Sequence, residues 1–229
     1  VISLVESFLK QDIMEDMDRW TPTAGTPQGA VLSPLLSNLY LHPFDAMMAE
    51  SGYEAVRYAD DFVIFCRSKT EAEAILTEVQ QWTRANGLTL HPDKTHIGNC
   101  LGKGQGFQFL GYLFEAGHRY VRKKSLLAFR DRIRQKTKRS RGVSVEQIIG
   151  ELNPSLMGWF GYFKHARSTT FRGVDGFVRR RLRAVLRKQI KRPGQGTAWS
   201  DKLRWSNAFF AERGLFTMHE AWIVASRSR

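Results

Sequence analysis

The stretch Tyr58-Ala59-Asp60-Asp61 contains the side chains of this sequence that are best placed for catalysis. It separates an extended run, Glu54 to Arg57, from the apolar run Phe62 to Cys66, which predicts a β-hairpin with acidic groups at its tip. Side chains alternate along a strand, so neighbouring aspartates can face one site only where a turn breaks the alternation. Carboxylates in such a place can bind two divalent ions that activate an attacking oxygen and stabilise a leaving phosphate oxygen.

An isolated pair of aspartates also has a simpler explanation, because aspartate is favoured in turns whatever the function. On these four residues alone, a structural turn and a metal site both stay open. The elements around the pair therefore have to decide between them.

The first 50 residues predict two helices joined by a loop. Apolar residues at positions 2, 5, 8 and 9 recur at helical spacing, and the polar residues 12–18 that follow show no strand pattern. Thr21–Gly29 is rich in Thr, Pro and Gly, which suits a backbone that approaches a ligand. Ser33-Pro34 predicts the start of the second helix, which Pro43 should kink or split. Its expected buried stripe is Leu35, Leu36, Leu39 and Tyr40.

The residues after the hairpin predict a helix and then strands. Thr70–Glu73 is a candidate capping box, and Gly87 is a plausible helix stop. The run 88–94 favours a strand that leads into a loop. Phe107–Phe114 predicts one strand, and a glycine within it would let another backbone approach closely.

The net charge of +13 is unevenly distributed along the chain. Residues 1–118 carry 8 Lys/Arg and 15 Asp/Glu, a net charge of −7. Residues 119–192 carry 22 Lys/Arg and 4 Asp/Glu, a net charge of +18, and residues 193–229 add +2. A short charge run is usually a solvated face, but an acidic half followed by a basic half favours binding of phosphate backbones by the second half.

The basic half predicts a small bundle of helices. A cationic helix is expected over 129–138, and helix starts are expected at Ser144 and at Asn153-Pro154. A third helix, Phe171–Arg192, has an apolar stripe and cations on its other faces. Its candidate phosphate contacts are Arg172, Arg179, Arg180, Arg181, Arg183, Arg187 and Lys188.

Composition excludes several classes of protein. The two cysteines, Cys66 and Cys100, form no disulfide framework or CxxC metal site. No apolar run is long enough to cross a membrane, and no secretory signal opens the sequence, so we expect a cytoplasmic protein without a membrane partner.

Four motifs occur in the order seen in reverse transcriptases: Gly25–Leu41, Tyr58–Asp61, Gly87–Thr95 and Phe109–Tyr112. A fifth motif, Gly158–Phe163, follows them. With these five motifs the chain resembles the bacterial group II intron reverse transcriptase and maturase family, from about Val5 to the C-terminus.

The resemblance implies an α+β fold, with a polymerase palm of antiparallel sheet and packed helices followed by an all-α three-helix thumb bundle. The expected domains are a partial palm at 1–118, a basic maturase-like thumb at 119–192 and a short helical C-terminal extension at 193–229.

The resemblance also assigns roles to residues. Asp60 and Asp61 would be catalytic and would hold magnesium, two ions in all, which manganese could replace. The nucleotide would lie beside Pro27, Gln28, Gly29, Tyr58, Ala59 and Lys94, and the primer beside Phe109, Leu110 and Gly111. The arginines of the third basic helix would grip nucleic acid.

One departure from the family matters. Its members carry another metal-binding Asp on a strand upstream of the Thr-Pro-Gln-Gly block, whereas Asp12, Asp16 and Asp18 lie in a stretch without a strand pattern. We therefore expect the fingers and the first palm Asp to be lacking, and this chain alone to be inactive or weakly active. An N-terminal segment or partner chain would then supply the Asp.

The resulting hypothesis is an RNA-directed DNA polymerase of group II intron type. Its partners would be an RNA template, a DNA primer, a deoxynucleoside triphosphate (dNTP) and intron RNA, whose splicing it would assist. The alternative is a maturase-like RNA-binding protein without catalysis, and a reverse transcriptase with a defence role shares the same palm.

Overall fold

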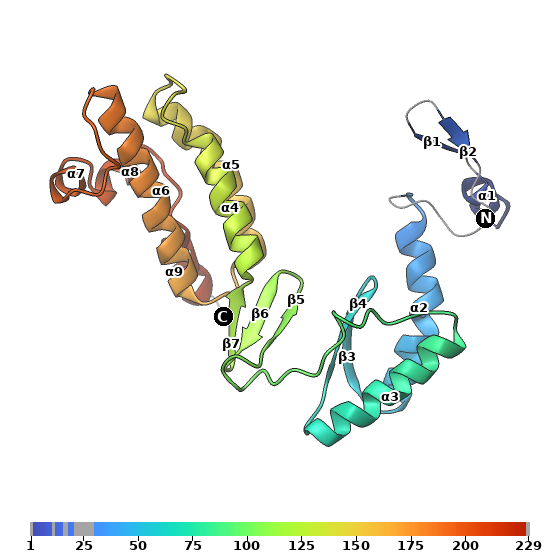
Figure 1. Cartoon of the computed structure of the whole chain (residues 1–229). Helices are drawn as coiled ribbons and strands as arrows, with labels where there is room; N and C mark the ends of the chain where they lie inside the picture. The colour runs from blue at the N-terminus through green and yellow to red at the C-terminus, as the bar shows by residue number, and fades with distance from the viewer. Residues whose placement is uncertain (1, 11, 16–17, 21–29, 228–229) are drawn as a thin grey trace. The chain divides into compact units, whose positions relative to one another are not determined.

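The computed structural model describes residues 2–10, 12–15, 18–20 and 30–227, and the chain divides into two compact units, Val1–Ile97 and Gly98–Arg229 (Figure 1). Both units combine helices with small antiparallel sheets, in agreement with the expected α+β class. The division into domains at 118 and 192 stays a prediction.

The first unit begins with helix α1 (Ile2–Leu9), at the position where apolar spacing predicts one. Strands β1 (Ile13–Glu15) and β2 (Asp18–Trp20) then pair antiparallel, with Ile13 opposite Trp20. The expectation of no strand in this stretch is therefore wrong. Strands of three residues are too short for alternation to be recognised in a sequence.

Helix α2 (Ser33–Glu50) runs unbroken through Pro43, so the expected split does not occur. The expected buried stripe is also wrong, because Leu35, Leu39 and Tyr40 are 60%, 69% and 55% exposed. The helix instead buries Phe44 and Met48, which lie in its C-terminal half. This half packs in a core shared with Ile75 and Val79 of helix α3 (Lys69–Ala85).

The predicted hairpin is present as β3 (Glu54–Tyr58) and β4 (Asp61–Phe65). The two strands pair antiparallel from Glu54–Phe65 to Tyr58–Asp61. Phe62 and Ile64 pack against the core formed by α2 and α3, which anchors one face of the hairpin. Helix α3 begins at a Ser68 cap and ends before Gly87, whose φ of +66° is typical of a helix stop.

The second unit opens with three short antiparallel strands, β5 (Phe107–Phe109), β6 (Tyr112–Glu115) and β7 (His118–Val121). The prediction of one strand over 107–114 is wrong, because the chain reverses at Leu110 and Gly111, and Phe109 pairs with Tyr112. Both turn residues have positive φ, +48° and +78°, as a type I′ hairpin turn requires.

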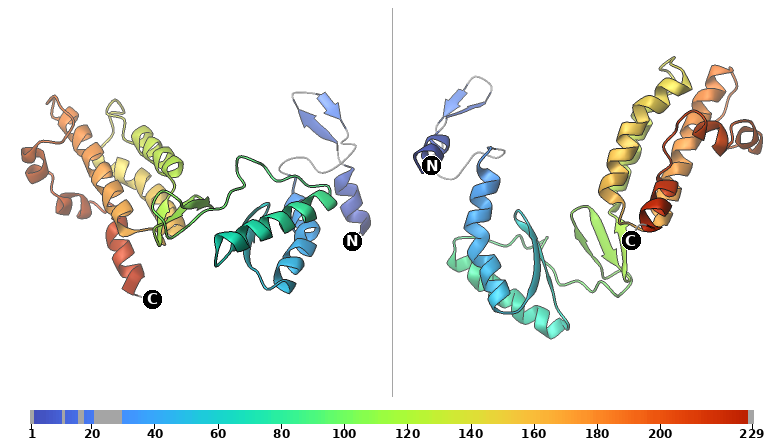
Figure 2. Two further views of the ribbon diagram at one scale, coloured as in Figure 1. Left: turned by 60° about the horizontal axis from the view of Figure 1, so that its bottom comes forward. Right: turned by 180° about the vertical axis from the view of Figure 1, so that it is seen from behind.

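Three helices follow the sheet: α4 (Lys123–Lys136), α5 (Val145–Phe163) and α6 (Ser168–Gln189). Helices α5 and α6 lie side by side in both views of Figure 2. The helix start predicted at Ser144 is confirmed, since its hydroxyl accepts a hydrogen bond from the Gln147 amide. The start predicted at Asn153 is wrong, because α5 continues through Pro154. Ile133, Leu152 and Phe171 lie in the common core.

The last segment adds α7 (Trp199–Arg204), α8 (Asn207–Ala211) and α9 (Met218–Arg227). Trp205, Phe210 and Met218 are buried in the same core as α4–α6, so this segment packs into the second unit. The buried Asp175 carboxylate of α6 accepts hydrogen bonds from the Met218 and His219 amides at the start of α9. Among the described residues, no helix is long and apolar enough to cross a membrane.

Candidate active site and nucleic-acid interface

The Asp60–Asp61 pair lies at the tip of the β3–β4 hairpin, with Ala59 and Asp60 as the two turn residues. Ala59 has a φ of +55°, in the left-handed region that non-glycine residues rarely adopt, at a typical cost of about 1–2 kcal/mol. Such strain persists only where surrounding contacts hold it, and it is frequent at functional sites. The turn that breaks strand alternation, which the sequence predicts, is therefore present and is held in place.

Arg57 supplies the contacts that hold this turn. Its Nη1 donates to the Ala59 carbonyl oxygen at 2.9 Å and to Oδ1 of Asn38 at 3.0 Å. Its Nε donates to Oδ1 of Asp45 at 2.8 Å, and its Nη2 pairs with the other oxygen of that carboxylate. Asn38 and Asp45 belong to α2, so a single guanidinium connects the turn to this helix.

Charge as well as geometry favours this connection. The Arg57 side chain is 12% exposed, and that of Asp45 is 40% exposed. The hydrogen bond from Arg57 holds the pKa of the Asp45 carboxyl below its ordinary value, so the pair is charged at neutral pH. Arg57 had no predicted role, because its partners lie 12 and 19 residues upstream and no local pattern marks them.

The carboxylate oxygens at this turn suit magnesium or a similar divalent ion. Asp60 and Asp61 are exposed, and no hydrogen bond or ion pair among the described residues occupies their carboxylates. Carboxylate oxygens are the ligands that magnesium prefers. Within the described part of the chain, no group of three or more His, Cys, Asp or Glu residues could hold a metal ion. The turn therefore offers two of the ligand groups that a two-ion site needs.

The other residues expected near the nucleotide are distributed as follows. Tyr58 ends β3 with a side chain 66% exposed, directly before the turn. Lys94 is exposed in a turn of the same unit, where its amide donates to the His91 carbonyl oxygen. No hydrogen bond or ion pair of the described residues joins Lys94 to Asp60 or Asp61. Pro27, Gln28 and Gly29 lie outside the described residues.

The residues expected at the primer, Phe109, Leu110 and Gly111, form the β5–β6 turn. The hydroxyl of Tyr162 in α5 donates to the Leu110 carbonyl oxygen at 2.9 Å, and the Arg122 amide donates to that of Gly111 at 2.8 Å. A Cβ on Gly111 would lie 3.3 Å from the Phe163 ring. Glycine at this position thus serves the positive φ and the packing on α5.

Three of the seven cations expected to contact nucleic acid are used within the protein. Arg181 donates to the hydroxyl and the carbonyl oxygen of Thr137 at 2.9 and 2.8 Å. Arg183 is 7% exposed and donates to the Trp205 carbonyl oxygen at 2.9 Å. Arg187 donates to both carboxylate oxygens of Asp201 at 2.8 Å.

The side chains of the other four cations of α6 donate no hydrogen bond to a carbonyl or carboxylate oxygen of the described residues. Arg172 and Lys188 are exposed, and Arg179 and Arg180 are half-buried. The Nη2 atom of Arg172 lies 3.3 Å from the Nε2 atom of His219.

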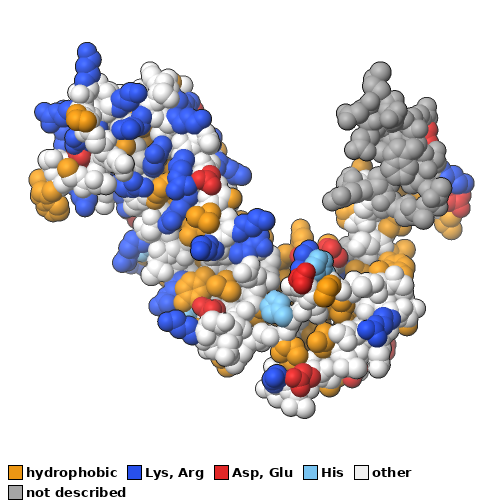
Figure 3. All heavy atoms as spheres, viewed as in Figure 1, with side chains coloured by type: hydrophobic (Ala, Val, Ile, Leu, Met, Phe, Trp, Pro, Cys, Tyr) orange, Lys and Arg blue, Asp and Glu red, His pale blue; other side chains and the backbone are white. Residues whose placement is uncertain are grey.

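Arg180 belongs to a cationic cluster that α6 shares with α4. The guanidinium carbons of Arg130, Arg134 and Arg180 lie 5.6, 5.5 and 5.4 Å from the centre of the Phe177 ring. Burial and then the charges of Arg180, Arg134 and Arg139 lower the pKa of Arg181, which indicates a dense positive field. Lys and Arg side chains cover much of the second unit in Figure 3. The roles of Arg130 and Arg134 were missed, although their spacing on a cationic helix is visible in the sequence.

Two family models match the chain. The model described as reverse transcriptase (RNA-dependent DNA polymerase) matches residues 2–114, and the model described as the group II intron maturase-specific domain matches residues 126–205. The first match contains the Asp60–Asp61 turn, and the second contains most of α4 and all of α5 and α6.

Curated proteins are also similar to the chain. Protein YkfC of Escherichia coli (strain K12) is 33% identical over 44% of this chain and 33% of its own length. The group II intron-encoded protein LtrA of Lactococcus lactis subsp. cremoris is 43% identical over 20% of this chain and 8% of its own length. The chain thus spans a third or less of these relatives. The two family models match in chain order, and LtrA is a group II intron-encoded protein. The chain therefore belongs to the group II intron reverse transcriptase and maturase family.

Proposed function

We propose that this chain is part of an RNA-directed DNA polymerase of group II intron type. It would contribute the catalytic turn and the surface that binds nucleic acid. The observation that carries the proposal is the exposed Asp60–Asp61 pair at a strained hairpin turn that Arg57 connects to α2. Among the described residues, neither carboxylate has a hydrogen-bond or ion-pair partner, which leaves both available to a metal ion. Residues 1–118 would be the palm, and residues 119–192, which include α4–α6, would be the thumb.

Members of the reverse transcriptase family generally use divalent metal ions. Magnesium at this turn would lower the energy of the charge that develops on the transferred phosphoryl group. Asp60 would be a direct ligand, and Asp61 would be a second ligand or would orient the first. Arg57 is a positioning residue, because its hydrogen bond to Ala59 fixes the backbone from which both carboxylates project.

The accessible cations of the second unit would bind the phosphates of the template and primer. Arg180 with Arg130 and Arg134 around Phe177, together with Arg172, Arg179 and Lys188, forms the proposed interface. Contacts of this kind go mainly to phosphate and sugar and fix the position of a duplex without reading its sequence. Arg181, Arg183 and Arg187 would support this face from within, through their hydrogen bonds to Thr137, Trp205 and Asp201. Intron RNA would use the same chemistry.

Two carboxylates are too few for a complete two-ion site, so we propose that the 229 residues alone extend a primer poorly. A segment that carries the family's other metal-binding Asp, in the same polypeptide or in a partner chain, would complete the site. The dNTP would lie beside Tyr58, Ala59, Lys94 and the Pro27–Gly29 loop, and the primer end beside Phe109, Leu110 and Gly111.

Primer extension on an RNA template with magnesium tests this proposal. The chain is assayed alone and joined to the fingers and first palm segment of a family member. We expect extension only in the joined form, and its loss in the Asp60→Asn variant. Glu54→Gln, at the other end of the same hairpin, is the matched control and should retain extension. Efficient synthesis by the chain alone would refute the incomplete metal site. RNA binding without extension in either form would favour the non-catalytic maturase.

A further inference from the structure

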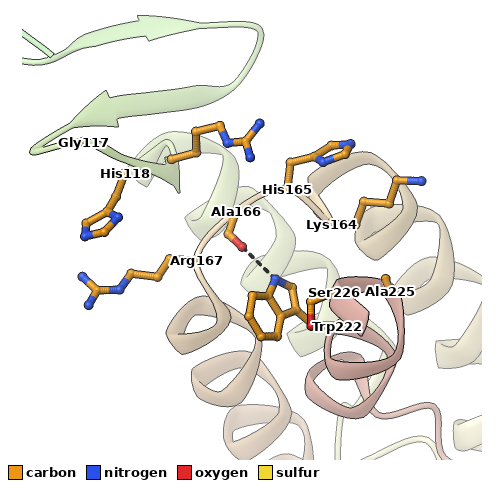
Figure 4. Close-up of a pocket in the computed structure, with 10 residues that line it drawn as sticks. Gly117, His118, Lys164, His165, Ala166, Arg167, Trp222, Ala225 and Ser226 are labelled. Carbon is orange, nitrogen blue, oxygen red and sulfur yellow. Dashed lines mark hydrogen bonds between the residues drawn. The ribbon is translucent and has the colours of Figure 1, made fainter. Parts of the chain in front are cut away.

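A second group of cations lies in a pocket where three segments of the second unit meet (Figure 4). The end of the β6–β7 turn with the start of β7 (117–119), the α5–α6 loop (164–167) and α9 form its walls. Its volume is about 260 Å³. None of its cations belongs to the proposed α4–α6 interface, and α9 lies outside both family matches.

The charged side chains that line this pocket among the described residues are all basic. Arg119, Lys164 and Arg167 line it together with His118 and His165. No ion pair among the described residues uses Arg119 or Lys164, and both side chains are exposed. Three permanent cations around one small cavity attract an anion, and Arg and Lys are common binders of phosphate in proteins.

The walls are connected by hydrogen bonds, so the backbone segments that carry the cations are joined before a ligand arrives. The Arg167 amide donates to the Arg119 carbonyl oxygen at 2.9 Å, which joins the α5–α6 loop to β7. The Arg167 Nη1 donates to the Tyr120 hydroxyl at 3.0 Å. The Trp222 Nε1 donates to the Ala166 carbonyl oxygen at 3.1 Å, which joins α9 to the same loop (Figure 4). Such pre-organisation lowers the entropic cost of binding.

The size and lining of the pocket restrict the ligand further. Sites for whole small molecules usually have about 300–1,000 Å³, and this cavity lies below that range, which suits a small group such as a phosphate. Ala166, Trp222 and Ala225 add an apolar surface next to the cations. A phosphate with its attached sugar has the matching combination of one charged end and one less polar end.

We propose that this pocket binds a phosphate group of a nucleic-acid strand, with Arg119 and Lys164 donating to the phosphate oxygens and Trp222 in contact with the adjoining sugar. The proposal rests on the proposed nucleic-acid binding of the second unit and adds a contact region outside its α4–α6 face. It gives α9 a direct role in binding.

Lysine footprinting of the unmodified chain tests this proposal without any substitution. The protein is acetylated with and without a single-stranded RNA oligonucleotide, and the modification of each lysine is measured by mass spectrometry. We expect RNA to protect Lys164 in the pocket and Lys188 on α6, whereas the exposed Lys202 of α7 should react equally in both conditions.

The other footprinting outcomes separate the two proposals. Protection of Lys188 without Lys164 would overturn the pocket and leave the α4–α6 interface standing. Protection of neither would overturn both. The acetylation is repeated with inorganic phosphate in place of RNA, at the same concentration of phosphate groups. Equal protection of Lys164 by inorganic phosphate would overturn the assignment to a nucleic-acid strand.

Charge reversal provides an independent measurement. The double variant Arg119→Glu/Lys164→Glu should lower the slope of log affinity for RNA against log salt by about 1–2, since each lost phosphate contact removes about one unit. The control Lys202→Glu/Arg204→Glu makes the same charge change on α7, also at exposed side chains, and should change the slope less. An equal change in both variants would overturn the pocket as a specific site.

Discussion

Replacement of Arg57 should loosen the Asp60–Asp61 turn more than any other single change outside the turn itself. Hydrogen bonds to charged groups typically contribute about 1.5–3 kcal/mol, and exposed ion pairs less than about 1 kcal/mol. The Arg57 side chain is 12% exposed and its partner Asp45 is 40% exposed, which places this pair between the two cases. With the bonds to Asn38 and Ala59 added, we expect Arg57→Met to cost about 2 kcal/mol locally.

Hydrogen exchange measured by mass spectrometry reads this cost segment by segment. A loss of about 2 kcal/mol should speed the exchange of the β3–β4 amides about 30-fold, since every 1.4 kcal/mol is a factor of ten. Exchange in the α5 and α6 peptides should not change, because those helices belong to the other compact unit.

A double-mutant cycle with Asp45→Asn then isolates the pair. We expect Asp45→Asn alone to cost about 1 kcal/mol and the coupling between the two changes to be about 1 kcal/mol. The pKa of Asp45 is depressed in the folded state, so the contribution of the pair is present above the ordinary carboxyl value of 3.8 and is lost as the pH falls below it. Unchanged exchange in β3–β4, or a coupling near zero, would refute the role of Arg57 as the anchor of the turn.

The remaining predictions concern the second unit. Arg183→Glu should lower the thermal stability strongly, by about 3 kcal/mol or more, because it buries a carboxylate beside the Trp205 carbonyl oxygen. Arg180→Glu should preserve stability and weaken RNA binding in a titration. A loss of stability with unchanged RNA binding would contradict the assignment of Arg180 to the binding face. Gly111→Ala should cost more in thermal unfolding than Gly117→Ala, since both have positive φ (+78° and +71°) but only the first would bring a Cβ to 3.3 Å from Phe163. Equal costs would show that the contact with Phe163 does not determine the cost of the substitution. Burial raises the pKa of Asp175, so its contribution to stability is fully present below pH 3.8 and is lost as the pH rises through the raised value. Asp175→Asn should remove this part of the pH dependence of the melting temperature, and an unchanged profile would contradict it.

The hairpin around Asp60 and Asp61 could be predicted because its signals are local. Two extended runs flank a short polar turn, and Phe62 and Ile64, two residues apart, pack against the same core. The turn at Leu110–Gly111 could not be predicted in the same way. Leucine at a φ of +48° goes against its own preference, and contacts from Tyr162 and Arg122, which are distant or lie outside the turn, hold it.

The roles of the basic residues show a second limit of sequence reasoning. Periodicity separates the apolar stripe of α6 from its cationic faces, but it does not reveal which cationic face a later segment covers. Arg183 is buried against the segment that follows α6, where it donates to the Trp205 carbonyl oxygen and lies 5.5 Å from the centre of the Phe210 ring. Arg57 is an anchor only because α2 brings Asn38 and Asp45 next to the hairpin.

Helix α2 illustrates the same limit for apolar residues. Leu35 and Leu39 form a regular stripe, yet both are exposed, and Phe44 and Met48 beyond Pro43 form the core instead. The stripe shows that a face is apolar, and only the packing of neighbouring elements shows which part of it is buried.

Iron-directed cleavage tests the central claim, that Asp60 and Asp61 together hold a divalent ion, most directly. Iron(II) bound in place of magnesium reduces added hydrogen peroxide to hydroxyl radicals that cut the adjacent backbone, and ascorbate regenerates the iron(II), so the readout needs no polymerase activity. We predict a cut between β3 and β4 in the unmodified chain that excess magnesium suppresses. The cut should disappear in Asp60→Asn/Asp61→Asn and persist in Glu54→Gln. A cut elsewhere, or one that survives loss of both aspartates, would contradict the account.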